Sequence, residues 1–415
     1  MIEGLSTARL ANLNEFLKTA LIGQVISDPP IGGESPIWSA TDKCRELCQI
    51  AHQTYTFHAT PLFFIPVAST VPNAYAINLN GFDAIVLTDR LIKAIDGFTL
   101  YLTRYLELML DKPAPVGQVR RFGAFSVLSP LPGSTRSKMN ALYWIIRDGV
   151  LAFLVGHELG HLASGHIPVL IHHRDLVKNS AGAAWDEAGA ADAMDAGTKD
   201  ARASEVLVAH EIDADIQGMH FLARHWCNVV ADVAVSTEQQ MVSSAVLATT
   251  PLRYMMSIIC IGIAFMLLGL EPFNANWKQR KSHPSGATRI LTAMISMSNF
   301  FPDADGRALM TCQAAEALTF VHAAWGQALL QHKPSAENPD HPTYTPRDAA
   351  VYAGLSTMSA DARHAFLFNA TGIDGMVQAS GEMETFLQHM SQTYGTESSR
   401  RVQSRRTRPE QMVIW

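Results

Sequence analysis

Residues 142–161 read LYWIIRDGVLAFLVGHELGH, a strongly apolar stretch that ends in an H-E-x-x-H box. The apolar residues at its start recur at helical spacing, and the same stripe continues onto His157 and His161. Both imidazoles are therefore expected to point inward, one helical turn apart, with Glu158 beside them. This arrangement is typical of a zinc ion that keeps one coordination position open for water. Two core histidines bonded to backbone groups are the alternative.

A third metal ligand must come from elsewhere in the chain, because zinc hydrolases usually have three protein ligands. The metzincin pattern is excluded, since Ser164 and Ile167 stand where it needs Gly and His. Residues 206–218 read VLVAHEIDADIQG and predict a second helix, on which Glu211 and Asp215 share a face. We interpret Glu211 as the third ligand and Asp215 as the acceptor of a hydrogen bond from a ligand histidine. A solvated acidic helix face is the alternative.

Four blocks of sequence, spread along the chain, point to one family. They are a strand and turn at 61–76 followed by a strand at 84–92, the run from His157 to His166, the E-x-x-A-D group from Glu211 to Asp215, and the box SHPSGATRI at 282–290. Together they resemble the gluzincin metallopeptidases of the CAAX prenyl protease and HtpX heat-shock protease group. The resemblance covers roughly residues 60–295, a span that fits one domain.

The resemblance implies an α+β fold that is mainly α-helical. Its zincin-like catalytic core would have a small β-sheet packed beside the H-E-x-x-H helix, with helical additions at both ends of the chain. We accordingly expect an N-terminal helical segment at 1–59, a zinc metallopeptidase domain at 60–299, a C-terminal helical region at 300–394 and a basic tail at 395–415. The tail is expected to be disordered and solvated.

Apolar periodicity and turn signals predict the individual elements. The H-E-x-x-H helix is expected at 137–164, ending near His166, which would cap it or support a ligand histidine. Residues 179–200, rich in Ala, Gly and Asp, predict a flexible surface excursion that would act as a lid. Strands are expected at 62–67, 74–78 and 84–88, with a helix from there to about 110 and further helices near 5–22, 40–55, 203–225, 236–248, 252–270, 284–299 and 307–331.

The candidate ligands predict the chemistry of the site. One Zn²⁺ per chain would be held by His157, His161 and Glu211. Glu158 would take the proton of zinc-bound water as it attacks the scissile carbonyl, and would then protonate the leaving amine. These roles predict a zinc-dependent endopeptidase of the gluzincin type that hydrolyses peptide bonds of a polypeptide substrate.

Other residues are candidates for the substrate cleft. His283, Arg289 and Tyr75 would stabilise charge on the carbonyl oxygen or line the cleft. A structural role is the alternative for His283 and is preferred for Arg289, as an ion pair that ties its helix to the core. An extended substrate is expected to pair with a sheet edge above the cleft. That edge strand is predicted to contain Ala84, Ile85, Val86, Leu87 and Thr88.

Composition limits the setting of this chemistry. The net charge of −6 gives no general attraction to nucleic acid, which we exclude as a partner. Five cysteines without regular spacing suit a reducing compartment, and the first residues lack the pattern of a signal peptide. A cytoplasmic location is therefore expected, with inner-membrane association as the alternative.

The apolar content of the chain raises the question of membrane contact. Charged residues make up 17% of the chain, whereas soluble domains average about 25%. The uncharged run 254–270 touches the lower length limit of a membrane-spanning helix. A buried core helix is favoured, because a span there would separate pieces that must fold into one site. Contact of the basic tail, 395–415, with anionic lipid or an acidic partner is not favoured either.

Three alternative functions stay open at this point. A membrane-associated processing or quality-control protease would use the same site chemistry. A triggered toxin or phage-exclusion-like protease would cut one host protein. A catalytically silent interaction protein would keep the zinc for stability alone. A cytoplasmic protease must also be restrained, and we expect residues 179–200 or the C-terminal region to restrain it.

Overall fold

The computed structural model describes most of the N-terminal two thirds of the chain. The described residues are 5–20, 22–26, 35–54, 61–79, 81–111, 133–164, 166–167, 182–186, 201–231 and 238–268, with Arg289, Ile290, Ala293, Ala317, Leu318, Val321 and Ala324. His283, the tail 395–415 and most of the helices expected at 284–299 and 307–331 lie outside the described residues. The fold and the candidate site described below consist of these residues.

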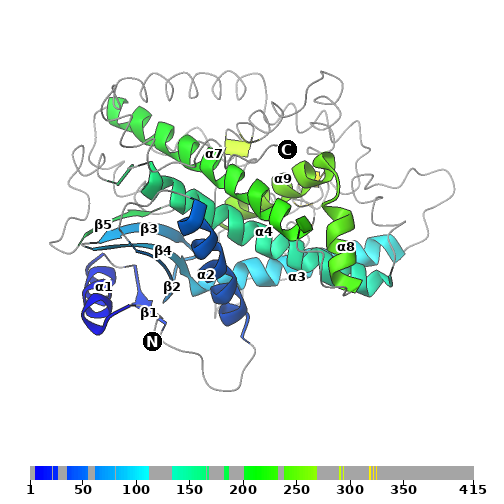
Figure 1. Ribbon diagram of the computed structural model, residues 1–415, viewed down its shortest axis with the longest axis horizontal. Coiled ribbons are helices and arrows are strands. Elements are labelled where there is room, and N and C mark those ends of the chain that lie inside the picture. The colour runs from blue at the N-terminus through cyan, green and yellow to red at the C-terminus, as the bar shows by residue number, and fades with distance from the viewer. Residues whose placement is uncertain are drawn as a thin grey trace, which may run out of the picture.

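A five-stranded mixed sheet has the order β1-β2-β4-β3-β5 (Figure 1). Strands β2 and β4 are parallel, and the other neighbouring pairs are antiparallel. Residues of the expected excursion at 179–200 contribute β5, and β1 had no sequence signal. The strands are β1 (Gln24–Val25), β2 (Leu62–Ala68), β3 (Ala74–Leu79), β4 (Phe82–Thr88) and β5 (Gly182–Asp186).

Strand β4 lies inside the sheet, so the expectation that residues 84–88 form a free edge is wrong. It pairs with β2 from Leu62↔Asp83 to Val67↔Thr88 and with β3 from Ala74↔Leu87 to Leu79↔Phe82. Every residue of β4 is buried, as expected of a strand covered on both faces and both edges. Within the described sheet, the edge strands are β1 and β5.

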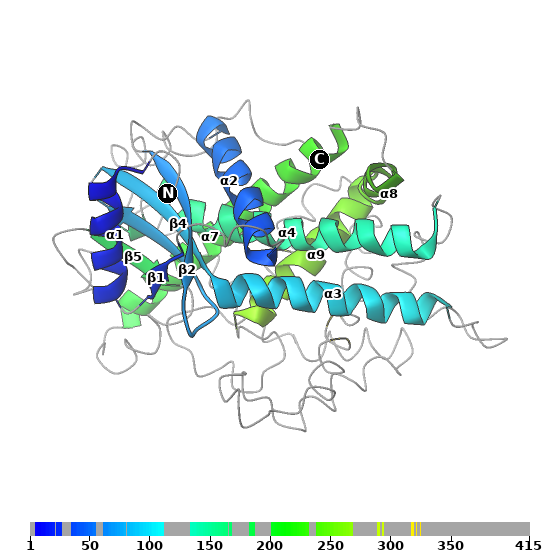
Figure 2. The ribbon, with the colours of Figure 1, turned by 90° about the horizontal axis from the view of Figure 1, so that it is seen from below.

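Helices cover both faces of the sheet, and the expected mainly helical α+β fold is confirmed. One core lies between α1 and the sheet, and a larger core joins the opposite face to α2, α3, α4, α7, α8 and α9. Figure 2 shows the sheet between α1 and this helical body. The helices are α1 (Thr7–Thr19), α2 (Pro36–Thr54), α3 (Asp89–Asp111), α4 (Thr135–Ala163), α7 (Ala201–Ala231), α8 (Glu238–Val246) and α9 (Thr250–Leu267).

Helix α4 carries the H-E-x-x-H box through the middle of the larger core. It begins after Ser134, whose hydroxyl oxygen accepts a hydrogen bond from the Ser137 backbone N–H at 3.1 Å. By length and composition α4 is long and apolar enough to cross a membrane, but most of its apolar window is buried inside the protein. The site histidines therefore lie on a helix that is largely enclosed by the rest of the described fold.

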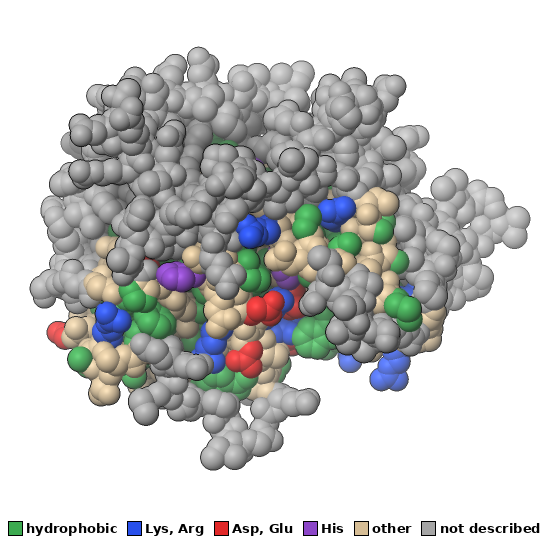
Figure 3. All heavy atoms as spheres, viewed as in Figure 1, with side chains coloured by type: hydrophobic (Ala, Val, Ile, Leu, Met, Phe, Trp, Pro, Cys, Tyr) green, Lys and Arg blue, Asp and Glu red, His purple; other side chains and the backbone are tan. Residues whose placement is uncertain are grey.

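Helix α9 contains most of the uncharged run 254–270, for which membrane contact was considered. The described side chains from Tyr254 to Leu268 are all buried in the larger core. In this structure the run therefore packs as a core helix. On the face drawn in Figure 3, acidic and basic side chains of the described residues are interspersed.

Candidate metal centre

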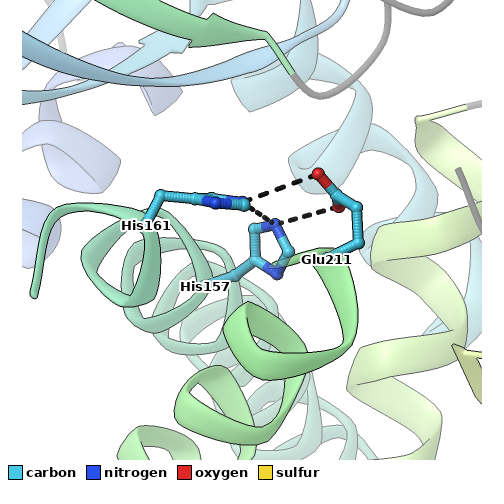
Figure 4. A group of neighbouring side chains, drawn as sticks. All are labelled: His157, His161 and Glu211. Carbon is cyan, nitrogen blue, oxygen red and sulfur yellow. Dashed lines mark hydrogen bonds and ion pairs between the residues drawn. The ribbon is translucent and has the colours of Figure 1, made fainter. Parts of the chain in front are cut away.

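Three candidate ligands from two helices converge in the core. His157 and His161 lie on α4 and Glu211 on α7, and their donor atoms all fall within 4.8 Å of one another (Figure 4). The two histidine Nε2 atoms are 3.1 Å apart. The Glu211 carboxylate lies 3.6 Å from Nε2 of His157 and 3.7 Å from Nε2 of His161. The sequence-predicted residues are therefore brought together with their donor atoms pointing at a common point.

Close packing of α4 against α7 allows this convergence. A Cβ on Gly160 would lie 2.9 Å from the Cα of Ala214, and one on Gly156 would lie 3.1 Å from the Cα of Gly218. The first of these distances is shorter than real Cβ atoms essentially ever show, so a side chain at Gly160 would push the helices apart. Small residues therefore let the two backbones lie close together. This close approach brings the Glu211 side chain within reach of the two histidines.

The spacing of the donor atoms fits a zinc ion. Ligands held tetrahedrally at about 2.0–2.2 Å from zinc lie about 3.4 Å from one another. The two Nε2 atoms are 3.1 Å apart, Oε2 of Glu211 lies 3.6 Å from His157 and Oε1 lies 3.7 Å from His161, so each neighbouring pair of donor atoms is close to that value. Two imidazoles and one carboxylate also form a common ligand set of catalytic zinc sites, which leaves a fourth position for water or substrate.

The charge balance around the site also fits a divalent cation. Near the three ligands, four buried carboxyl groups face one buried guanidinium among the residues that the structure describes. Buried carboxylates are costly unless a positive charge compensates them. A divalent cation would supply much of that compensation. The carboxyl groups belong to Glu158, Glu211, Asp213 and Asp215, and the guanidinium to Arg289.

A carboxylate lies beside one of the candidate ligand histidines. Nδ1 of His157 lies 3.0 Å from Oδ1 of Asp215. Arg289 grips the same carboxylate by donating from Nε to Oδ2 at 2.8 Å and from Nη2 to Oδ1 at 2.7 Å, and its Nη1 lies 3.5 Å from Glu211. The ring of Phe265 packs against the guanidinium at 4.3 Å. Asp215 thus lies beside the outer nitrogen of His157, and Arg289 forms an ion pair with the core, as preferred for it.

The other candidate ligand, His161, contacts a chain of two further residues. Nδ1 of His161 lies 3.0 Å from Nδ1 of His166, and Nε2 of His166 lies 3.1 Å from Oδ2 of Asp213. The ring of His210 stacks on His166 with centroids 4.2 Å apart. The sequence left His166 as either a helix cap or a support for a ligand histidine, and Asp213 and His210 were not among the candidates. The only available signal was their position on either side of Glu211 on the same predicted helix.

The remaining predicted residues have different outcomes. Glu158 is fully buried on α4, next to the candidate ligand His157 in sequence. Tyr75 belongs to the core on the α1 side of the sheet, whereas its neighbours Ala74 and Ala76 face the core of α4. Side chains alternate along a strand, so the expectation that Tyr75 lines the cleft is wrong.

Comparison with known proteins agrees with this geometry. A family model described as "Peptidase family M48" matches residues 42–294. The chain belongs to peptidase family M48. This is the family of the CAAX protease and HtpX-type metallopeptidases, so the resemblance drawn from the sequence is confirmed. The M48 match includes both α4 and α7, and hence all three candidate ligands. Comparisons with curated proteins and with solved structures gave no match.

Proposed function

We propose that this M48 family member is a zinc-dependent endopeptidase that hydrolyses peptide bonds of a polypeptide. The observation that carries the proposal is the convergence of His157, His161 and Glu211 within 4.8 Å, with a buried carboxyl group, Glu158, adjoining the first ligand. Membership of a metallopeptidase family supports the same chemistry.

Each residue of the site has a distinct task in this proposal. A zinc ion held by His157, His161 and Glu211 would supply a Lewis acid for the scissile carbonyl and would make a water molecule acidic enough to lose a proton near neutral pH. Glu158 accepts that proton and passes it to the leaving amine. Asp215 orients His157, and Arg289 offsets part of the negative charge of Asp215 and Glu211. Arg289 is engaged by carboxylates, so we assign it to positioning.

The substrate would bind as an extended chain along a sheet edge. Strand β4 is interior, and β3, which packs on α4, has β5 as its outer neighbour. The backbone groups on the outer side of β5 therefore take the role first given to residues 84–88. Pairing through backbone groups selects an extended polypeptide more than a particular side chain.

The decisive experiment compares the unaltered protein with Glu158→Gln. We expect both proteins to contain about one zinc per chain, because Glu158 is not among the three converging ligands. Only the unaltered protein should generate new peptide fragments from unfolded protein substrates, detected by mass spectrometry of their new termini. Equal fragment yields from both proteins would contradict the proposal, as would a folded, active protein that contains no metal.

Proline scanning of β5 tests the substrate edge. Successive residues of a strand point their N–H groups to opposite sides, so Ala183→Pro and Ala184→Pro remove donors on different sides of β5. We expect the variant that loses the outward N–H to keep its zinc and lose cleavage of unfolded protein. If both variants cleave as fast as the unaltered protein, or faster, β5 is not the substrate edge.

A further inference from the structure

We propose that His166 and Asp213 are a positioning pair that holds the second zinc ligand, His161, in its metal-binding tautomer and orientation. The inference rests on the proposed zinc site and deepens it. It assigns a role to two buried residues that the hydrolytic chemistry above does not use. His166 is fully buried and Asp213 is 2% exposed.

The direction of the hydrogen bonds follows from their chemistry. A carboxylate only accepts, so Nε2 of His166 donates its proton to Asp213 across 3.1 Å. A zinc-bound His161 can donate only from Nδ1, so the proposed zinc site requires His166 as a neutral imidazole, whose single N–H is on Nε2 and whose Nδ1 accepts. The 3.0 Å contact between the two Nδ1 atoms is then donated by His161. His161 consequently carries its proton on Nδ1.

This proton position prepares His161 for the metal. With Nδ1 protonated, Nε2 keeps its lone pair, and Nε2 is the atom that faces His157 and Glu211. Both nitrogens of His166 are engaged, one with His161 and one with Asp213. His166 is therefore a support for a ligand and not a ligand itself.

Packing fixes the plane of the supporting ring. The ring of His210 stacks on His166 with an angle of 24° between the planes and 4.2 Å between the centroids. Since His210 and Asp213 lie on α7 while His161 lies on α4, the pair also ties the two ligand-bearing helices together. One ligand thus has a direct carboxylate partner, Asp215, and the other has a carboxylate acting through an imidazole.

The test measures zinc affinity in variants that separate positioning from packing. His166→Phe keeps a stacking ring but removes both hydrogen bonds, whereas His166→Gln keeps one donor and one acceptor. Asp213→Leu removes the carboxylate at similar volume. His225→Phe is the matched control, because His225 is buried on α7 about 21 Å along the helix from Glu211.

We expect His166→Phe and Asp213→Leu to weaken zinc binding by about 10- to 100-fold in chelator competition. His166→Gln should restore most of that affinity, and His225→Phe should leave it within about twofold, as a change outside the ligand supports does. Melting of the metal-free proteins serves as the second readout. If zinc affinity fell only because the fold was damaged, the melting temperatures of His166→Phe and His166→Gln would both be lowered.

Two results would overturn the inference. One is a zinc affinity of His166→Phe equal to that of His225→Phe. The other is a failure of His166→Gln to bind zinc more tightly than His166→Phe. If the unaltered protein takes up no zinc, the proposed function itself fails. If it binds zinc tightly and cleaves while the His166 variants match it, only the positioning pair is refuted.

Discussion

The two ends of the α4–α7 helix pair differ in how their ionisable side chains are compensated, although Arg147 at the far end also lies 4.0 Å from Asp148. At the metal end, carboxylates meet a guanidinium and imidazoles. At the far end, burial raises the pKa of Asp148 to about 6 and that of Cys48 to about 12, and lowers the pKa of His225 to about 3. About 14 Å of helix separates Asp148 from His157. Burial by itself drives groups toward their neutral forms, so charge persists in this core where partners or a cation compensate it.

The largest expected difference between the two ends is in metal binding. Glu211→Gln replaces an anionic ligand by a neutral amide and should weaken zinc binding by more than about 100-fold, beyond the loss of a supporting residue. His225→Gln, a change at the far end, should leave zinc affinity unchanged. Chelator competition measures both. Equal affinities for the two variants would remove Glu211 from the ligand set.

The next largest effect is on stability and concerns Arg289, whose guanidinium compensates the buried carboxylates of the metal end. Arg289→Gln should lower the free energy of unfolding of the metal-free protein by about 3–5 kcal/mol, since it leaves buried carboxylates without their partner. Urea denaturation with a chelator present measures this, and Arg289→Lys, which keeps the charge, should lose less. A loss below about 1 kcal/mol would mean that the pair behaves like an exposed one.

A smaller difference between the two ends is expected from glycine substitutions on α4, at each end of its contact with α7. Gly160→Ala presses on the backbone of Ala214, so it should cost about 1–3 kcal/mol and weaken zinc binding by moving α7. Gly149→Ala meets the side chain of Trp226 at 2.4 Å and should cost stability at the far end without changing zinc affinity. Gly97, with open space around its Cβ position, is the control: Gly97→Ala should gain up to about 1 kcal/mol. Unfolding and zinc titrations of all three variants measure these effects. Equal zinc affinities of Gly160→Ala and Gly149→Ala would mean that the spacing of α4 and α7 does not control the site.

The smallest effect is a pH dependence at the far end. Burial raises the pKa of Asp148 above its unfolded value of 3.8, so the native protein binds more protons than the unfolded chain between about pH 4 and 6. Stability from this group is therefore present at low pH and lost as pH rises through 6.

Asp148→Asn removes that dependence. At pH 8 it should be more stable than the unaltered protein by about 1 kcal/mol, a value discounted because the side chain is partly exposed. At pH 4 the two proteins should be equally stable in urea. A variant that is less stable at pH 8 would show that Asp148 stays charged and paired.

Local patterns in the sequence predicted the three side chains that converge at the metal end. The helical spacing of His157 and His161, and that of Glu211 and Asp215, is set within single helices, so one-dimensional periodicity carries it. The match of four blocks then supplied the family. Which helix faces which is harder to predict, and the small residues Gly160 and Ala214 at the contact were recognised only in the structure.

Pairing between distant segments could not be read in this way. An apolar run such as Phe82–Thr88 predicts a strand, but its neighbours are set by the rest of the sheet, and so its edge position was wrong. Strand β5 forms on the free side of β3 from a stretch whose composition is typical of a loop. Asp213 escaped notice because it acts through His166, which comes from another helix.

We infer that α4 and α7 together hold one zinc ion through two imidazoles and one carboxylate. X-ray absorption at the zinc edge of the purified protein can show these ligands. We expect about one zinc per chain with a shell of nitrogen and oxygen atoms at about 2.0–2.2 Å, and loss of the carboxylate signal in Glu211→Gln. A sulfur shell near 2.3 Å, or a folded protein that binds no zinc, would contradict it.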